Sequence, residues 1–328
     1  MKIAIFSTHK FDKKYFNLHN IYNLEFTFIE NTINQDSLKL AQKHDAICVF
    51  ANDKVDQTII AILSDMNIKL IALRSAGFDN IDLLSAKQYN IPVVRVPAYS
   101  PYSVAEHAVA MILTLNRKTH KAYNQVKERN FTLDNLLGFD LFGKTVGIIG
   151  CGKIGSAFAK IMLGFGCNVM IYDPYINDKI VAFGAKYINL EKLLNISDII
   201  SLHCPLTENN FHLINSETIY QMKQGVCLIN TGRGGLINTV DVKNAILNSK
   251  IGLLGLDVYE HEKDIFFKDL SNNVINDLII LELLMFPNVL ITSHQGFFTH
   301  EALTKIATTT IENIYKFFTG KIQNQITI

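Results

Sequence analysis

The stretch Val146-Gly147-Ile148-Ile149-Gly150-Cys151-Gly152-Lys153-Ile154-Gly155 predicts a buried β-strand, a glycine turn and the start of a helix. In such a turn the first glycine permits a tight bend and the second allows close approach of a pyrophosphate. The third glycine lets the helix pack closely on the strand. Gly150, Gly152 and Gly155 have this spacing, so the stretch predicts a dinucleotide site in an α/β domain.

The residues that follow indicate which dinucleotide binds. The next apolar run, 168–172, ends at Asp173, and the residues after it, Pro174-Tyr175-Ile176, include no arginine. A carboxylate at this place accepts hydrogen bonds from the adenosine ribose and repels a 2′-phosphate, which favours NAD over NADP. The Gly-Lys-Ser/Thr spacing of a phosphate-binding P-loop is missing here, so that alternative is excluded.

Composition sets the limits of the interpretation. A chain of 328 residues with 48% hydrophobic and 19% charged residues predicts two folded domains. The net charge of +1 and the lack of a basic block argue against nucleic acid as a partner. We also expect no membrane partner, because no apolar run is long enough to span one. The start has no signal-peptide pattern, and five cysteines without CxxC spacing favour a reducing, cytoplasmic location.

Apolar runs and amphipathic segments alternate along the chain, which is typical of parallel sheets with crossover helices. We predict strands at 3–6, 46–50, 70–73, 93–96, 145–149, 168–172, 199–203, 226–230, 253–257 and 289–292. We predict helices at 36–44, 57–66, 103–119, 153–164, 191–194, 240–248 and 301–318. The helix at 103–119 is apolar on more than one face, so we expect it to be buried between domains or subunits. The last helix has no strand of its own to follow and should return to the first domain.

Six of the later strands give way to a loop at a residue suited to a cofactor or substrate site. In open α/β sheets, ligands bind at the carboxyl ends of the strands. The residues at these ends are Gly150, Asp173, Pro205, Arg233, Asp257 and His294. Together they predict one active site along one sheet edge.

Two of these side chains and a nearby carboxylate would suit the reduction of a 2-oxo acid. Arg233, in a Gly-Arg-Gly-Gly turn, could bind a carboxylate with its planar fork and polarise a carbonyl. His294 could protonate the oxygen as hydride arrives at carbon. A carboxylate would orient the imidazole, and both Glu260 and Glu262 stand where one could do so. His107 and His203 are secondary candidates, and the Glu-His-Glu run predicts no metal site, because it lacks the usual ligand spacing.

The chain resembles the D-isomer-specific 2-hydroxyacid dehydrogenases over essentially its whole length. The resemblance is carried by residues 74–80, 96–101, 146–155, 201–207, 230–234, 255–260 and 293–295. Residues 105–117, 172–175 and 264–272 are most similar to the fermentative D-lactate dehydrogenases of that family.

The resemblance implies an α/β fold with two doubly wound parallel-sheet domains, Rossmann-like and flavodoxin-like, and a cleft between them. We expect residues 1–100 plus 297–328 to form a discontinuous substrate (catalytic) domain and residues 101–296 to form an NAD-binding Rossmann domain. The family is usually dimeric and higher oligomers occur, so a homodimer or homotetramer is expected.

The resemblance also assigns roles to residues. It makes Arg233, Glu262 and His294 catalytic, with Glu262 and not Glu260 orienting the histidine. It implies substrate contacts at Ala76, Gly77, Tyr99 and Phe297. Beside the three fingerprint glycines, it implies cofactor contacts at Lys153, Ile154, Asp173, Cys204, Pro205, Asn210, Thr231, Gly232 and Asp257.

The sequence thus predicts an NAD-dependent enzyme that reduces pyruvate to D-lactate with NADH in fermentation. Two alternatives remain open. One is the same reaction on a larger 2-oxo acid, and the other is a non-enzymatic, NAD-sensing corepressor that retains the fold. A phosphoglycerate-type enzyme is less favoured, because the chain has no room for a further regulatory domain.

Overall fold

The computed structural model describes residues 1–327, which divide into two compact units. The first unit contains Met1–Ser100 and the segment that begins at Phe298, and the second contains Pro101–Phe297. Phe297, which the sequence analysis assigned to the first domain, clusters with the second unit. Ile328, also assigned there, lies outside the described residues.

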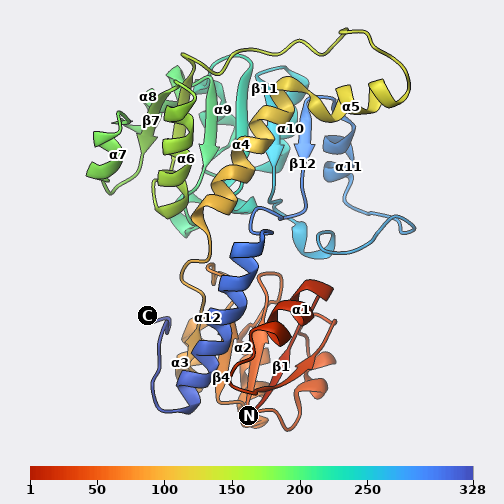
Figure 1. The fold of residues 1–328 in the computed structure, drawn as a ribbon, viewed down its shortest axis with the longest axis vertical. Helices are drawn as coiled ribbons and strands as arrows, with labels where there is room; N and C mark the ends of the chain where they lie inside the picture. Colours follow the sequence, from red (N-terminus) through yellow and green to blue (C-terminus); the bar gives the residue numbers. More distant parts are fainter. Residues whose placement is uncertain (328) are drawn as a thin grey trace. The chain divides into compact units, whose positions relative to one another are not determined.

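The described part of the first unit contains a five-stranded parallel sheet in the order β2-β1-β3-β4-β5 (Figure 1). Its strands are β1 (Lys2–Ile5), β2 (Glu25–Phe28), β3 (Ala46–Val49), β4 (Leu70–Leu73) and β5 (Val93–Val94). Its helices are α1 (Lys10–Leu18), η1 (Ser37–Ala41), α2 (Gln57–Asp65), α3 (Leu83–Gln88) and α12 (His300–Phe318). The strands β1, β3 and β4 are buried almost throughout, as expected for a parallel sheet covered on both faces.

A buried ion pair fixes α1 to the carboxyl end of β4. Arg74 is 1% exposed, and its Nε donates to Asp12 Oδ1 at 3.1 Å while Nη2 donates to the Ser7 carbonyl at 2.7 Å. The guanidinium also lies 4.8 Å from the centre of the Phe50 ring. A buried charge is tolerated only when it is paired in this way. The pair therefore anchors the start of the loop that continues to Ala76 and Gly77.

The described part of the second unit contains a seven-stranded parallel sheet in the order β12-β11-β10-β9-β6-β7-β8. Its strands are β6 (Thr145–Ile149), β7 (Asn168–Tyr172), β8 (Lys186–Tyr187), β9 (Ile199–Leu202), β10 (Val226–Asn230), β11 (Ile251–Leu256) and β12 (Val289–Ile291). The chain runs from β6 outward to β8 and then returns to β9 on the other side of β6. This reversal is the switch point at which doubly wound sheets bind ligands.

Helices cover both faces of this second sheet (Figure 1). The helices of this unit are α4 (Pro101–Arg117), α5 (Thr119–Lys127), α6 (Lys153–Gly164), α7 (Asp178–Ala182), α8 (Leu190–Ile196), α9 (Ser216–Gln221), α10 (Thr239–Leu247) and α11 (Leu278–Met285), of which α5 projects away from the sheet. Short 3-10 turns are η2 (Glu208–Asn210), η3 (Gly234–Leu236) and η4 (Glu262–Asp264). The long helix α4 packs on α6 and on β10, β11 and β12. Much of the apolar surface of α4 therefore packs within its own unit.

Several local predictions were incomplete or wrong. Residues 36–44 were predicted to form an α-helix, but the chain forms only the 3-10 turn η1. Asp36 provides no side-chain cap, and Lys43 takes a left-handed conformation (φ +63°) that ends the turn. The sequence analysis did not predict α1, β2, α3, α5, α7, β8, α9 and α11. Most of these are short, and α5 is polar in composition and buries none of its residues.

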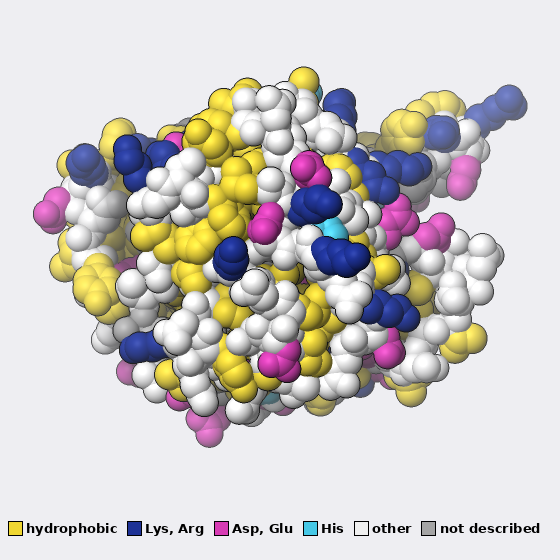
Figure 2. Space-filling view, turned by 90° about the horizontal axis from the view of Figure 1, so that it is seen from below, with side chains coloured by type: hydrophobic (Ala, Val, Ile, Leu, Met, Phe, Trp, Pro, Cys, Tyr) yellow, Lys and Arg dark blue, Asp and Glu magenta, His cyan; other side chains and the backbone are white. Residues whose placement is uncertain are grey.

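The surface of the protein is mixed in charge and polarity. On the face drawn in Figure 2, Lys and Arg side chains lie among Asp, Glu and apolar side chains. This face therefore carries charges of both signs. Within residues 1–327 we found no helix with the length and apolar character needed to cross a membrane.

Candidate active site

The sheet order of the second unit groups the predicted site residues into two sets. Arg233, Glu262 and His294 follow β10, β11 and β12, which are neighbours in the sheet. Most of the predicted cofactor contacts follow β6, β7 and β9, which are also neighbours. Because all these strands are parallel, both sets emerge at the carboxyl edge of one sheet.

His294 and Glu262 form a direct pair at this edge. The distance from His294 Nδ1 to Glu262 Oε1 is 2.7 Å, and the two side chains are only 19% and 24% exposed. The second oxygen of Glu262 accepts a hydrogen bond from the Tyr259 backbone N–H at 2.9 Å. The carboxylate is therefore held at both oxygens, which orients the imidazole and leaves Nε2 as the ring nitrogen for a substrate.

The Asp257 carboxylate organises the loop that carries His294. Oδ1 accepts hydrogen bonds from Thr292 Oγ1 at 2.6 Å and from the Gln295 N–H at 2.8 Å, and Oδ2 accepts one from the Gly296 N–H at 2.8 Å. His107 Nε2, on α4, lies 3.2 Å from Oδ1. Burial works against ionisation of Asp257, but hydrogen bonds from His107 and Thr292 outweigh it and lower its pKa.

The backbone of His294 has an uncommon conformation that this network stabilises. His294 has φ +51°, in the left-handed region that side chains other than glycine rarely adopt. Its N–H donates to the Asp257 carbonyl at 2.7 Å, and Ser103 Oγ donates to the Gly296 carbonyl at 2.5 Å. Asp257, predicted as a cofactor contact, thus has a structural task that the sequence did not reveal.

A buried asparagine shapes the turn that carries Arg233. Asn230, the last residue of β10, is fully buried; its side chain accepts from the Gly232 N–H at 3.0 Å and donates to the Arg233 carbonyl at 2.8 Å. Arg233 Nη1 also donates to the Gly232 carbonyl at 2.9 Å. The turn is thereby fixed by its own residues, and the half-buried guanidinium projects from a rigid base.

Glu260 binds a different histidine, His212, and not His294. One of its oxygens lies 2.6 Å from His212 Nε2, and the other accepts a hydrogen bond from Thr239 Oγ1 at 2.8 Å. The two glutamates that sequence reasoning could not separate therefore bind different histidines. Among residues 1–327 no group of three or more His, Cys, Asp and Glu side chains is arranged to hold a metal ion.

The three glycines of the turn after β6 are needed for two different reasons. A Cβ on Gly150 would lie 2.4 Å from the Cys204 backbone nitrogen, and one on Gly155 would lie 2.0 Å from the Gly150 carbonyl oxygen. A Cβ on Gly152 would meet no protein atom within 4 Å. Gly150 and Gly155 are therefore required by packing, whereas Gly152 leaves open space at the N-terminus of α6, as close approach of a pyrophosphate requires.

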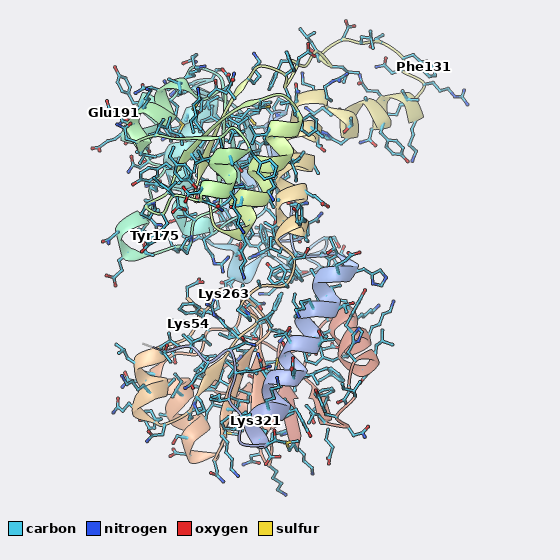
Figure 3. All side chains as sticks on the ribbon, turned by 60° about the vertical axis from the view of Figure 1, so that its left-hand side comes forward. Lys54, Phe131, Tyr175, Glu191, Lys263 and Lys321 are labelled. Atoms are coloured by element: carbon cyan, nitrogen blue, oxygen red, sulfur yellow. The ribbon has the colours of Figure 1, made fainter. Side chains whose placement is uncertain are left out.

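Asp173 lies beside this turn. Its carboxylate accepts hydrogen bonds from the Cys151 N–H at 2.6 Å and the Tyr175 N–H at 2.8 Å. A cavity of about 460 Å³ in the second unit is lined by these residues together with Gly152. Tyr175, labelled in Figure 3, is 82% exposed. The cavity is large enough for part of a nucleotide and has a carboxylate to bind hydroxyl groups.

The other predicted cofactor residues lie on the loops after β9 and β10. The side chain of Asn210 bridges the loop by donating to the Pro205 carbonyl and accepting from the Thr207 N–H, both at 2.7 Å. Thr231 Oγ1 is buried without a hydrogen-bond partner in the described structure, so a bound ligand could satisfy it. Burial lowers the pKa of His203 to about 3, so this histidine stays neutral within the protein.

The predicted substrate contacts are divided between the units. Ala76, Gly77 and Tyr99 belong to the first unit, where Arg95 Nη1 donates to the Ala76 carbonyl at 2.6 Å and Ser75 Oγ to the Gly77 carbonyl at 2.8 Å. Phe297 belongs to the second unit and is 7% exposed.

Sequence reasoning gave Phe267 no part in the site, although its ring lies 6.1 Å from that of His294. It belongs to the irregular segment after η4, where no periodic pattern could have revealed it.

Known proteins resemble this chain along its whole length. A family model described as "D-isomer specific 2-hydroxyacid dehydrogenase, NAD binding domain" matches residues 109–296. A D-lactate dehydrogenase of Escherichia coli is 45% identical over 322 residues, which cover 98% of each chain. The chain belongs to the D-isomer-specific 2-hydroxyacid dehydrogenases.

Solved structures of similar proteins have the same fold. The apo structure of the D-lactate dehydrogenase from Escherichia coli matches with a TM-score of 0.90 and 42% identity, and covers all of both chains. A D-lactate dehydrogenase from Aquifex aeolicus, complexed with NAD and lactic acid, matches with a TM-score of 0.87 and 37% identity. That match covers 97% of this chain and 96% of the other. The α/β fold predicted from the sequence is confirmed.

This 2-hydroxyacid dehydrogenase is therefore an NAD-dependent oxidoreductase whose substrate is a small 2-oxo or 2-hydroxy acid. Its own residues fit the cofactor. Gly152 leaves the space that a pyrophosphate needs, Asp173 offers a carboxylate beside it, and Thr231 has a buried hydroxyl without a partner. The prediction of NAD as the cofactor is confirmed.

The open space at Gly152 leads to a testable prediction. Gly152→Ala should leave thermal stability unchanged, because the added methyl group meets no protein atom within 4 Å. It should weaken NADH binding about tenfold, because the methyl group would occupy the space of the pyrophosphate. Titration of NADH by fluorescence measures the dissociation constant.

Gly164→Ala is the matched control for this experiment. Gly164 ends the same helix α6, and a Cβ there also meets no protein atom within 4 Å. This variant should bind NADH as the unmodified chain does. Equal NADH affinities of the two variants would contradict the role given to Gly152.

Proposed function

We propose that this enzyme reduces pyruvate to D-lactate with NADH. The observation that carries the proposal is the 2.7 Å pair between His294 and Glu262, held at the sheet edge where Arg233 also emerges. The similarity to the D-lactate dehydrogenase of Escherichia coli over 98% of the chain supports pyruvate as the oxo acid.

In the proposed reaction Arg233 binds and polarises the substrate. A guanidinium has donors in a planar fork that fits a carboxylate, and its charge draws electron density toward the carbonyl oxygen. The turn fixed by Asn230 holds the backbone of Arg233 before the substrate arrives. A group positioned in advance stabilises developing negative charge without reorganising.

His294 supplies the proton. Bound NADH provides the hydride that adds to the carbonyl carbon. The carbonyl oxygen gains the electron pair of the broken π bond and takes a proton from Nε2 of the protonated imidazole. Glu262, at Nδ1, stabilises the positive charge of the ring before this transfer and keeps Nε2 directed away from the carboxylate.

The remaining contacts follow from the family resemblance. We propose that the first unit is the substrate domain, and that the backbone N–H groups of Ala76 and Gly77 bind the substrate carboxylate with Tyr99 nearby. We propose that the second unit binds NAD and that Phe297 limits the space for the substrate's side chain. The alternative substrate is a larger 2-oxo acid, which would require a wider pocket around the substrate's side chain.

We further propose that the enzyme is a homo-oligomer. The segment from α5 to residue 142 projects from the second unit, and Figure 3 labels Phe131 near its outer end. Phe131, Leu133 and Leu137, which are close together in the sequence, are 73%, 82% and 88% exposed there, and a partner chain would cover such apolar side chains. Light scattering should give a multiple of the 37.0 kDa chain mass, and a single-chain mass would contradict the proposal.

The activity itself is tested with the purified chain, NADH and pyruvate. NADH should be consumed, and an assay with stereospecific lactate dehydrogenases should identify D-lactate as the product. L-lactate, or no turnover, would contradict the proposal, and no turnover with any 2-oxo acid would favour an NAD-sensing corepressor. Higher kcat/KM for branched or aromatic 2-oxo acids would favour the larger substrate.

The role of His294 is tested by substitution. His294→Asn, which tolerates the left-handed backbone, and His294→Ala should lower kcat by ~10²–10⁴-fold, because general acid catalysis is lost. NADH affinity should be retained. His261→Ala, an exposed histidine next to Glu262, is the control and should keep nearly full activity. Turnover by the His294 variants close to that of the control would show that another group supplies the proton.

A further inference from the structure

Glu260 joins three loops at the carboxyl edge of the second sheet. It lies on the loop after β11, and its Oε1 is 2.6 Å from Nε2 of His212, on the loop after β9. Its Oε2 accepts hydrogen bonds from the N–H and the hydroxyl of Thr239, at 3.3 and 2.8 Å. Thr239 is the first residue of α10, on the segment after β10. One carboxylate thus connects the loops of three neighbouring strands.

The charge of Glu260 suits this place. Burial works against ionisation, but hydrogen bonds from His212 and Thr239 lower the pKa of the carboxyl below its ordinary value. The carboxylate also faces the N-terminus of α10, where the helix dipole favours negative charge. The side chains of Glu260 and His212 are 16% and 26% exposed, so the bridge is partly shielded from water.

The backbone around the bridge connects it to Arg233. A Cβ on Gly234 would lie 2.2 Å from the Tyr259 carbonyl carbon and 2.5 Å from the Glu260 nitrogen, so the loops after β10 and β11 are in direct contact. The His212 N–H donates to the Gly235 carbonyl at 2.8 Å. The segment that follows Arg233 is therefore held from one side by His212 and from the other by the loop of Glu260.

The same carboxylate is close in sequence to the group that orients His294. Glu262 follows Glu260 by two residues, and its Oε2 accepts from the N–H of Tyr259, the residue before Glu260. A shift of Glu260 would move the backbone from which Glu262 reaches His294. His212 itself has φ +53°, an uncommon conformation that directs its ring into the bridge.

We propose that the Glu260–His212 bridge is a positioning device that sets Arg233 relative to the Glu262–His294 pair. The inference rests on the proposed function, in which Arg233 binds the substrate carboxylate and His294 supplies the proton. Neither Glu260 nor His212 contacts the reacting atoms in this account. Their loss would loosen the loops and misalign the two groups that act on the substrate, and small displacements of that kind lower rates strongly.

The test uses oxamate, a pyruvate analogue that is not reduced, with the full-length enzyme and NADH. Glu260→Gln and His212→Asn should each weaken oxamate binding to the enzyme–NADH complex about tenfold and raise KM for pyruvate by a similar factor. The affinity for NADH alone should stay within about twofold. Asn is chosen because it tolerates the left-handed backbone of position 212.

Two comparisons separate positioning from general stability. Glu282→Gln removes the 2.6 Å ion pair between Lys243 of α10 and Glu282 of α11, and should change neither oxamate binding nor KM. The double variant Glu260→Gln/His212→Asn should bind oxamate about as weakly as either single variant, because both changes break the same bridge.

The inference would be overturned if the single variants bound oxamate as tightly as Glu282→Gln does. It would also be overturned if the losses of oxamate affinity in the two single variants added up in the double variant. Failure of the unmodified enzyme to bind oxamate or turn over pyruvate would instead overturn the proposed function, and the inference with it. Since the unmodified enzyme is measured first, the two failures are distinguished.

Discussion

The parallel direction of the strands in the second unit is the constraint on which the site depends. Every strand in the order β12-β11-β10-β9-β6-β7-β8 ends at the same edge, so each following loop emerges beside its neighbours. Residues as far apart in sequence as Gly150 and His294 therefore contribute to one region. The position of a residue in this arrangement depends on which strand precedes it. The loops after β6, β7 and β9 carry most of the predicted cofactor contacts, and those after β10, β11 and β12 carry the catalytic residues.

Buried polar side chains then fix the loops at this edge. Asn230 binds the turn of Arg233, Asp257 binds the loop of His294, and Glu260 connects the loops after β9, β10 and β11. Each of these groups is shielded from water and would be costly to leave unpaired, so each imposes a specific loop conformation. The hydrogen bonds of Asp257 even hold His294 in a left-handed backbone conformation, which the residue would not otherwise favour.

The sequence predicted the features that depend on local pattern. The glycine turn, most of the central strands and the terminal helix were predictable, because apolar periodicity and glycine spacing are local properties. Local pattern did not decide between Glu260 and Glu262 as the orienting carboxylate, and only the family resemblance selected Glu262. The two lie two residues apart in an irregular loop, and their partners His212 and His294 are 48 and 32 residues away. The same reason explains why the contacts of Asp257 with Thr292 and of Phe267 with His294 were not foreseen. The short and exposed elements, such as α5 and β8, carry too little pattern to be predicted.

In the proposed reaction, Arg233 and His294 act on the same substrate carbonyl. A crystal structure of the enzyme with NADH and oxamate would show whether they do. We expect the oxamate carbonyl oxygen to accept hydrogen bonds from the Arg233 guanidinium and from His294 Nε2, with Glu262 still paired to Nδ1. An oxamate molecule bound away from His294, or oriented with its carbonyl toward other donors, would show that the two residues do not act together.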